Sequence, residues 1–152
     1  MNKLTLAAIV LWLVTIAVFG WFFVHGNTRS SADGRTAVVL APLERDLILG
    51  EMRGLLGAVQ GIMEGLEKND NVRVAQAARA VGMASAVDVN PALMAKLPVE
   101  FKSLGMSVHH DMDDLAAAAE AGKTSQELLG SLGQTLSKCV ACHASWQLQA
   151  AQ

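Results

Sequence analysis

Apolar residues dominate the N-terminal segment of the chain. Between residues 4 and 24 only Thr5, Thr15 and Gly20 are not plainly apolar. A helix of about 21 residues rises roughly 30 Å, which matches the thickness of the hydrocarbon core of a bilayer. A secretory signal peptide has a shorter apolar stretch and a small-x-small cleavage site, whereas this segment ends in aromatic residues. We therefore expect residues 1–25 to form an uncleaved, single-pass transmembrane helix.

The next segment is polar. Gly, Ser, Asn and Asp are frequent from Gly26 to Arg35, a composition that is typical of flexible linkers. No segment beyond it alternates apolar and polar residues as a half-buried strand does. The sequence therefore predicts a tether over residues 26–41 and an all-α domain over residues 42–152.

Four amphipathic helices are predicted in this domain, because apolar residues recur there every three or four positions. The first covers residues 42–67 and begins with a proline, which suits the first helical turn. The second covers residues 72–85 and the third residues 98–122, with a looser stretch over residues 88–91 between them. A capping box over residues 124–127 opens the fourth, which is expected to run to about residue 150. Four such helices with mostly short connections predict an antiparallel up-down-up-down four-helix bundle.

One apolar stripe on each helix defines the predicted core. On the fourth helix the stripe includes His143, so we expect that helix to turn the histidine toward the bundle interior. The predicted core positions are Ile48, Met52, Leu55, Val59, Ile62 and Leu66; Val74, Ala78 and Val81; Phe101, Leu104, Val108, Met112 and Leu115; and Leu129, Leu132, Leu136, Val140 and His143.

Five glycines recur on the opposite side of the first helix. Each costs roughly 1 kcal/mol of helix stability relative to alanine, whereas a face of glycines lets another backbone approach closely. We therefore expect a second protomer or a partner subunit to pack there; the alternative is that a tolerant helix has accumulated them. The glycines are Gly50, Gly54, Gly57, Gly61 and Gly65.

Near the C-terminus stands Cys139-Val-Ala-Cys142-His143, the C-x-x-C-H spacing of c-type haem attachment. Each thiol can form a thioether to a haem vinyl group, and the adjoining imidazole can ligate the iron. The alternatives are a disulfide or a thioredoxin-like motif, but nothing around the motif predicts the strand-to-helix turn of the latter. The sequence therefore predicts one covalently attached haem c, held by Cys139 and Cys142, with His143 as the proximal iron ligand.

Charge and the remaining motifs exclude other functions. The formal net charge is −2 at pH 7, and no Lys/Arg-rich patch with interleaved aromatic residues indicates nucleic-acid binding. No Ser/His/Asp set, paired carboxylates or phosphate-binding loop occurs in the soluble part. We therefore expect no enzymatic activity and no nucleic-acid partner, and the haem is the only predicted chemistry.

A four-helix haem protein with its C-x-x-C-H motif on the last helix resembles the class II cytochromes c, the cytochrome c prime family. Class I cytochromes carry the motif near the N-terminus. The resemblance covers about residues 42–149 and implies that a side chain from the first helix covers the distal face of the haem, as a methionine ligand or as a bulky residue that does not ligate. The family motif is usually followed by an aromatic residue and an arginine. This chain has Trp146 and Gln147, so the role of that arginine is not carried over.

Met52 is the predicted distal ligand. It lies in the apolar stripe of the first helix, and packing of the first helix antiparallel to the last brings it within about one turn of the level of His143. The alternative is a core methionine that only fills a gap. His109 and His110 on the third helix compete as iron ligands, but their angular positions predict His109 at the flank and His110 in solvent.

These expectations combine into one predicted function, a membrane-tethered monohaem c-type cytochrome that transfers electrons to and from redox partner proteins. The resemblance implies haem attachment on the outer face of the cytoplasmic membrane, hence a single-pass protein with its haem domain in the periplasm. Two alternatives remain open. One is a haem protein that binds or senses nitric oxide or carbon monoxide, and the other is the haem subunit of a membrane redox complex.

Overall fold

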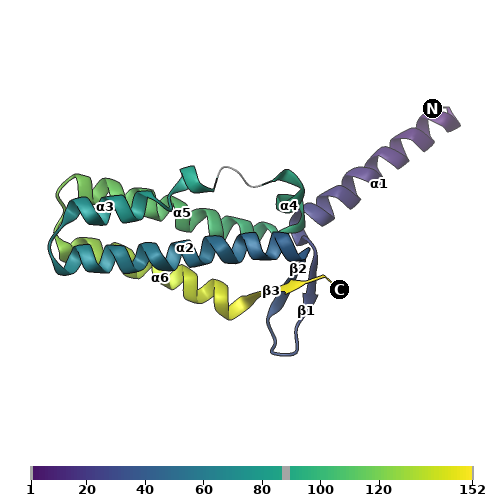
Figure 1. Cartoon of the computed structure of the whole chain (residues 1–152). Coiled ribbons are helices and arrows are strands. Elements are labelled where there is room, and N and C mark those ends of the chain that lie inside the picture. The colour runs from purple at the N-terminus through teal and green to yellow at the C-terminus, as the bar shows by residue number, and fades with distance from the viewer. Residues whose placement is uncertain (1, 87–89, 152) are drawn as a thin grey trace.

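The computed structural model describes residues 2–86 and 90–151, and helices dominate them (Figure 1). Residues 87–89, in the predicted looser stretch, lie outside the described residues. The helices are α1 (Lys3–His25), α2 (Pro42–Glu67), α3 (Asn71–Arg79), α4 (Pro91–Lys96), α5 (Val99–Glu120) and α6 (Ser125–Ser145), with a 3-10 turn at Met83–Ser85. The strands are β1 (Thr28–Ser30), β2 (Thr36–Leu40) and β3 (Trp146–Ala150).

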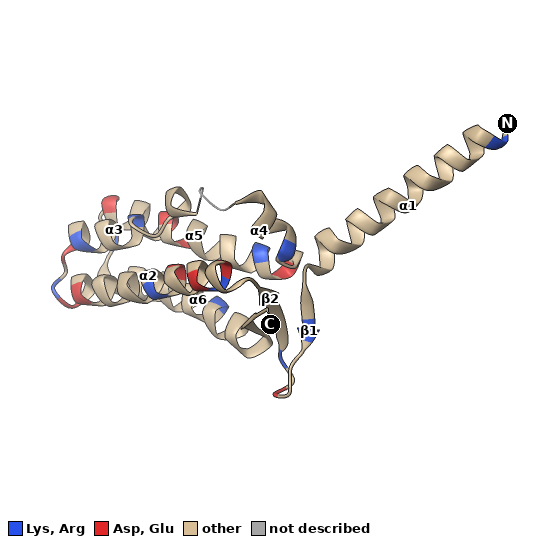
Figure 2. Ribbon diagram, turned by 45° about the vertical axis from the view of Figure 1, so that its right-hand side comes forward, with Lys and Arg blue, Asp and Glu red and all other residues tan. Residues whose placement is uncertain are grey.

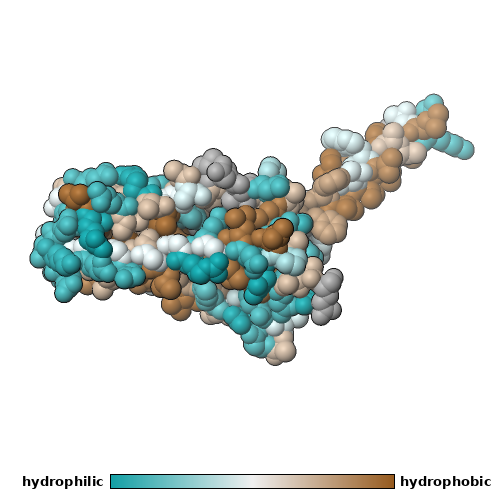
Figure 3. Space-filling view, in the orientation of Figure 1, coloured by the Kyte–Doolittle hydropathy of each residue, from teal (hydrophilic) through white to brown (hydrophobic). Residues whose placement is uncertain are grey.

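Helix α1 extends away from the rest of the molecule. No charged residue follows Lys3 along it (Figure 2), and its surface is apolar (Figure 3). None of its residues is buried, and its mean hydropathy reaches 2.5. Among the described residues it is the one helix long and apolar enough to cross a membrane, in agreement with the predicted segment.

Helices α2, α3, α5 and α6 lie alongside one another and share one hydrophobic core (Figure 1). Some of their predicted starts and stops are confirmed: α2 has the predicted bounds, and Thr124 and Glu127 form the capping box of α6. Gly122 has a φ of 76°, the left-handed conformation that lets glycine end a helix. The core comprises Ile62, Leu66, Val74, Ala75, Ala78, Met112, Leu115, Ala116, Ala119, Leu128 and Leu132.

Helix α3 is shorter than predicted, since it ends at Arg79 and not near Ser85. The Asp113 carboxylate of α5 occupies the space beside Gly82, where a Cβ atom would lie 2.1 Å from its oxygen. The same carboxylate accepts a hydrogen bond of 2.9 Å from the Met83 N–H. A hydrogen bond to α5, which is distant in the sequence but adjacent in space, therefore forms where the last turn of the predicted helix was expected.

The predicted inward face of the last helix was wrong at most positions. Leu132 is buried as expected, but Val140 is 70% exposed. The buried side chains Leu128, Leu132 and Thr135 define a different face. Thr135 can be buried because its hydroxyl donates to the Ser131 carbonyl at 3.2 Å, which satisfies its polar group.

The predicted tether is part of a three-stranded sheet, so the domain is not all-α. Strand β2 pairs antiparallel with β1 and parallel with β3, with Thr36 opposite Trp146. Strand β3 consists of residues that were expected to continue the last helix. Val38 and Leu40 are buried, and this burial stabilises the sheet against the end of the helical domain.

A second, smaller core lies where this sheet, α2, α4 and α5 meet. It forms the end of the domain from which α1 leaves (Figure 1). Trp146 packs edge-on against Phe101, with ring centroids 5.9 Å apart. The buried members of this core are Val38, Leu40, Ile48, Leu93, Leu97 and Phe101, against which Met52 and Cys142 pack.

Candidate haem site

A pocket opens beside the second core. The space in it that a water-sized sphere can occupy is about 130 Å³, and about 920 Å³ is free when its open mouth is included. Apolar side chains of α2, α4 and α5 form most of its wall. Cys139, Cys142 and His143 of α6 line the same pocket, so the predicted motif faces a cavity and not solvent alone.

The two cysteines continue the buried face of α6. Leu128, Leu132, Thr135, Cys139 and Cys142 follow one another at spacings of four and three, which places them on one side of a helix. Neither cysteine is in a disulfide. Burial raises the pKa of both thiols, so they are protonated at neutral pH.

His143 lies at the edge of the pocket. Helix α6 ends two residues later, at Ser145, and the His143 side chain is exposed although it lines the pocket. The prediction that His143 lies at the centre of the inward face was therefore wrong, because that face is centred on the cysteines. The imidazole remains on the same wall as both thiols, as the C-x-x-C-H spacing requires.

Met52, on α2, lines the same pocket. Its side chain is half-buried, and both Met52 and Cys142 pack against the second core. Ligation of iron by Met52 stays a prediction.

His109 lies in the pocket wall and not at the flank. It is 8% exposed, and its Nδ1 atom lies 2.8 Å from the Val81 carbonyl oxygen. A neutral imidazole that donates through Nδ1 keeps a free lone pair on Nε2. His110 is exposed, as predicted. The segment from Val81 to Ala86 covers the face of α5 that carries His109, which the sequence pattern of α5 alone did not indicate.

Three charged side chains at the pocket were not predicted. Lys138 pairs with Asp111 at 2.7 Å. Lys102 donates to the Met94 carbonyl at 3.1 Å, and burial lowers the pKa of its ammonium group. Glu51 is half-buried, and burial raises the pKa of its carboxyl group. Their spacing on the helices matches that of surface residues, so no sequence signal distinguished them.

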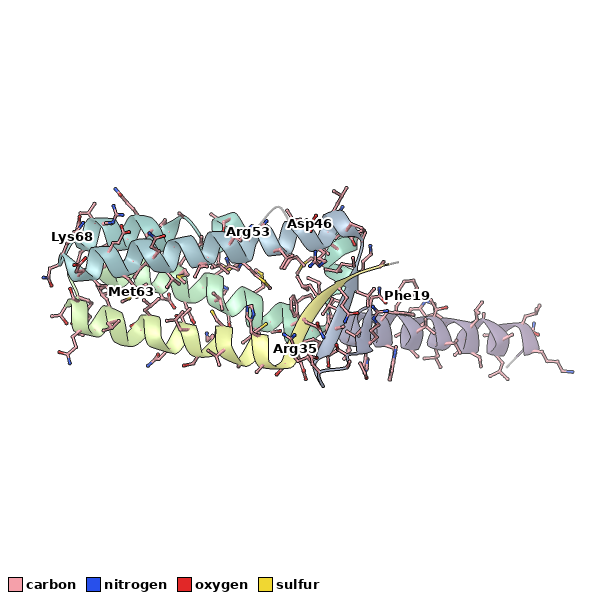
Figure 4. All side chains as sticks on the ribbon, turned by 60° about the horizontal axis from the view of Figure 1, so that its bottom comes forward. Phe19, Arg35, Asp46, Arg53, Met63 and Lys68 are labelled. Atoms are coloured by element: carbon pink, nitrogen blue, oxygen red, sulfur yellow. The ribbon has the colours of Figure 1, made fainter. Side chains whose placement is uncertain are left out.

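Arg35 binds the end of the motif helix from the other end of the chain. Its guanidinium donates to the carbonyl oxygens of His143, at 3.3 Å, and Trp146, at 3.5 Å. Asp33 pairs with the same guanidinium at 2.7 Å. Figure 4 shows Arg35 where the β1–β2 hairpin approaches the end of α6. A cation at the C-terminus of a helix is also favoured by the helix dipole.

The pocket residues include groups that could hold a haem. Among residues 2–86 and 90–151 no three His, Cys, Asp or Glu side chains form a cluster that could hold a metal ion. A haem needs only one or two axial ligands from the protein, because its porphyrin supplies the others. The pocket is lined by two imidazoles, of His143 and His109, and by the Met52 thioether, which could serve as such ligands. The thiols of Cys139 and Cys142 and several apolar side chains line it as well.

Comparisons with known proteins return no relative. The chain matches no protein-family model, and no curated protein or solved structure is significantly similar to it. The site is therefore interpreted from its own residues and from the resemblance that the motif carries.

Proposed function

We propose that the protein is a membrane-anchored monohaem c-type cytochrome, an electron carrier of the class II type. The observation that carries this proposal is that Cys139, Cys142 and His143 line one apolar pocket together with Met52. In this proposal α2, α3, α5 and α6 form the antiparallel up-down-up-down bundle of that class. The proposal assigns no enzymatic activity to the chain.

Each residue of the pocket has a defined role in the proposal. Cys139 and Cys142 hold the haem through thioethers, and His143 supplies the proximal imidazole. The bound haem supplies the one-electron couple between ferric and ferrous iron. Met52 closes the distal side, and the apolar side chains of α2, α4 and α5 exclude water from the pocket. Exclusion of water limits the charge rearrangement that accompanies electron transfer.

The anchor determines where the carrier works. In the proposal α1 crosses the cytoplasmic membrane once and the domain after it lies in the periplasm, where c-type haem is attached. The apolar sequence of α1, which has no Lys, Arg, Asp or Glu after Lys3, supports the membrane location. Redox partner proteins of the membrane or the periplasm are then accessible to the haem domain.

A specific observation favours gas binding as a second candidate. The buried ring of His109 lines the same pocket and would lie beside a small ligand there; because Nδ1 donates to the Val81 carbonyl, Nε2 of the neutral ring can only accept. This function requires that Met52 leave the distal position open. The two candidate functions therefore differ in whether Met52 occupies the distal position on the iron, which can be tested.

Removal of the Met52 thioether separates the carrier from the gas-binding protein. We expect the wild-type protein to be low-spin in both oxidation states and to bind carbon monoxide weakly. The Met52→Ala variant should become high-spin, have a lower reduction potential and bind carbon monoxide readily, because an open distal position on the iron accepts diatomic ligands. Absorption spectra of the oxidised, reduced and carbon monoxide forms measure these changes.

Met63 provides the matched control. It is an exposed methionine on α2 away from the pocket (Figure 4), so Met63→Ala should leave every spectrum unchanged. A wild-type protein that is already high-spin and binds carbon monoxide rapidly would favour gas binding. A low-spin spectrum that survives Met52→Ala and is lost in His109→Ala would assign the distal position to His109.

A further inference from the structure

The end of α1 is fixed to the domain without a free linker. Gly26 has a φ of 62°, and a Cβ atom there would lie 2.4 Å from the Lys96 carbonyl oxygen. The Asn27 N–H donates to that oxygen at 2.7 Å. The Lys102 ammonium lies 4.2 Å from the centre of the Phe23 ring, in the last turns of α1. The orientation of the domain relative to the membrane is therefore set by the direction in which α1 leaves it.

Two exposed leucines lie near the point where α1 ends. Val39 donates to the Asn27 carbonyl at 2.8 Å, and the Asn27 side chain donates back to the Val39 carbonyl at 2.8 Å. Leu43 follows Val39 by four residues, and four residues of chain span at most about 14 Å. Leu43 is 85% exposed, and Leu47, one turn later, is 50% exposed and lines the pocket.

The surroundings of these leucines match a membrane interface. Figure 3 shows apolar residues gathered on the end of the domain that adjoins α1, and Figure 2 shows basic residues around α4 and the start of α5. Lys96 is paired with Glu44 at 2.6 Å, so Lys102 is the cation directed at the last turns of α1. Basic side chains at the membrane surface are attracted to anionic lipid headgroups.

We infer that an end surface made of Leu43, Leu47 and Lys102 rests on the lipid surface of the membrane that α1 enters. The leucines lie at the boundary of the acyl chains and the lysine lies among the headgroups. Because Leu47 also lines the pocket, the rim of the haem site then touches the bilayer. The inference rests on the proposed anchoring by α1 and adds which face of the domain meets the membrane.

Single exposed leucines are common on soluble proteins. What distinguishes Leu43 and Leu47 from other exposed leucines is their location beside the end of α1. Leu129 provides the comparison, since it is also an exposed leucine but lies near the start of α6, at the opposite end of the domain. Both side chains are exposed, so either can be replaced without disturbing the core.

Site-specific photo-crosslinking in the full-length protein tests the inference. Leu43→p-benzoylphenylalanine, Leu129→p-benzoylphenylalanine and Phe19→p-benzoylphenylalanine are compared in nanodiscs of phosphatidylcholine and phosphatidylglycerol. Irradiation followed by mass spectrometry measures the mass shift of an attached lipid. We expect lipid adducts at positions 43 and 19 and none above background at position 129.

The other outcomes overturn the inference in distinguishable ways. Labelling at position 19 without labelling at 43 means that the domain stands clear of the lipid although α1 anchors it. A protein adduct in place of a lipid adduct at 43 assigns the surface to a partner protein. Equal labelling at 43 and 129 means that contact is not specific to this end. Absence of labelling at 19 contradicts the proposed anchoring itself.

Discussion

At the scale of single residues, Arg35 connects the two ends of the chain at the candidate site. Its guanidinium binds two carbonyl groups at the C-terminal end of α6, one of them that of His143. Helix C-termini leave carbonyl groups without intrahelical partners, and Arg35 satisfies two of them. In the family that the motif resembles, an arginine follows the motif, whereas here a cation from the β1–β2 hairpin lies at the end of the motif helix.

Loss of this contact should make the position of His143, the proposed proximal ligand, less fixed. We expect Arg35→Gln to lower the free energy of unfolding by about 1 kcal/mol, as for the loss of an ordinary hydrogen bond. The haem should stay attached, but its reduction potential should shift, because the position of His143 is less fixed. Thermal unfolding by circular dichroism and a redox titration measure the two effects.

Arg45 is the matched control, because it forms an exposed ion pair with its neighbour Asp46 at 3.3 Å. Exposed pairs of this kind contribute little, so Arg45→Gln should change neither stability nor potential appreciably. If Arg35→Gln behaves like Arg45→Gln, the hairpin does not position the motif.

At the scale of elements, the close packing of α2 and α3 explains part of the glycine stripe. A Cβ atom on Gly65 would lie 2.7 Å from Val74, and one on Gly61 would lie 3.0 Å from the Ala77 Cβ atom. Two of the five glycines thus allow α3 of the same chain to approach. Gly54 and Gly57 have open space beside them, so packing of a second protomer or a partner subunit there stays a prediction.

Two alanine substitutions on α2 should therefore have opposite signs. Gly65→Ala should destabilise the protein by about 1–3 kcal/mol, because the added methyl group overpacks the contact with α3. Gly54→Ala should stabilise it by up to about 1 kcal/mol, because alanine is the better helix former and meets no neighbour. Denaturant unfolding of both variants measures the difference. Equal stabilisation by both would contradict the packing of α3 on α2.

The sequence predicted elements well where the signal was local. The bounds of α2, the capping box of α6 and the length of α1 follow from residues within the element itself. The sheet could not be predicted in this way, because β2 pairs with β3 across more than half of the chain. The residues of β3, Trp146-Gln-Leu-Gln-Ala150, alternate apolar and polar side chains as a strand does, a local signal that the expected extension of the last helix overlooked.

For the candidate site too, local sequence signals predicted the residues, whereas features that depend on contacts between distant segments were missed. The identities of Cys139, Cys142, His143 and Met52 came from a motif and a helical stripe, and all four line one pocket. The rotation of α6 was missed because Val140 is apolar yet exposed. The burial of His109 depends on a segment from another part of the chain, which no pattern within α5 can indicate.

At the scale of the whole molecule, the pocket and the end of α1 share one end of the domain. The larger core, formed by α2, α3, α5 and α6, lies beyond the pocket as seen from α1 (Figure 1). The second core joins the sheet, the pocket and the end of α1. In the proposed orientation this arrangement keeps the candidate site at the membrane side, while the larger core stabilises the helices that carry it.

Covalent attachment of haem tests the central claim most directly. The full-length protein is produced in a host that attaches c-type haem, and its intact mass is measured after denaturation and acid–acetone extraction. We expect one haem to stay on the chain, and to be lost when both cysteines are replaced in Cys139→Ala/Cys142→Ala but kept in Ser145→Ala. A chain that releases its haem on extraction, or whose mass shows only a disulfide between Cys139 and Cys142, would contradict the account.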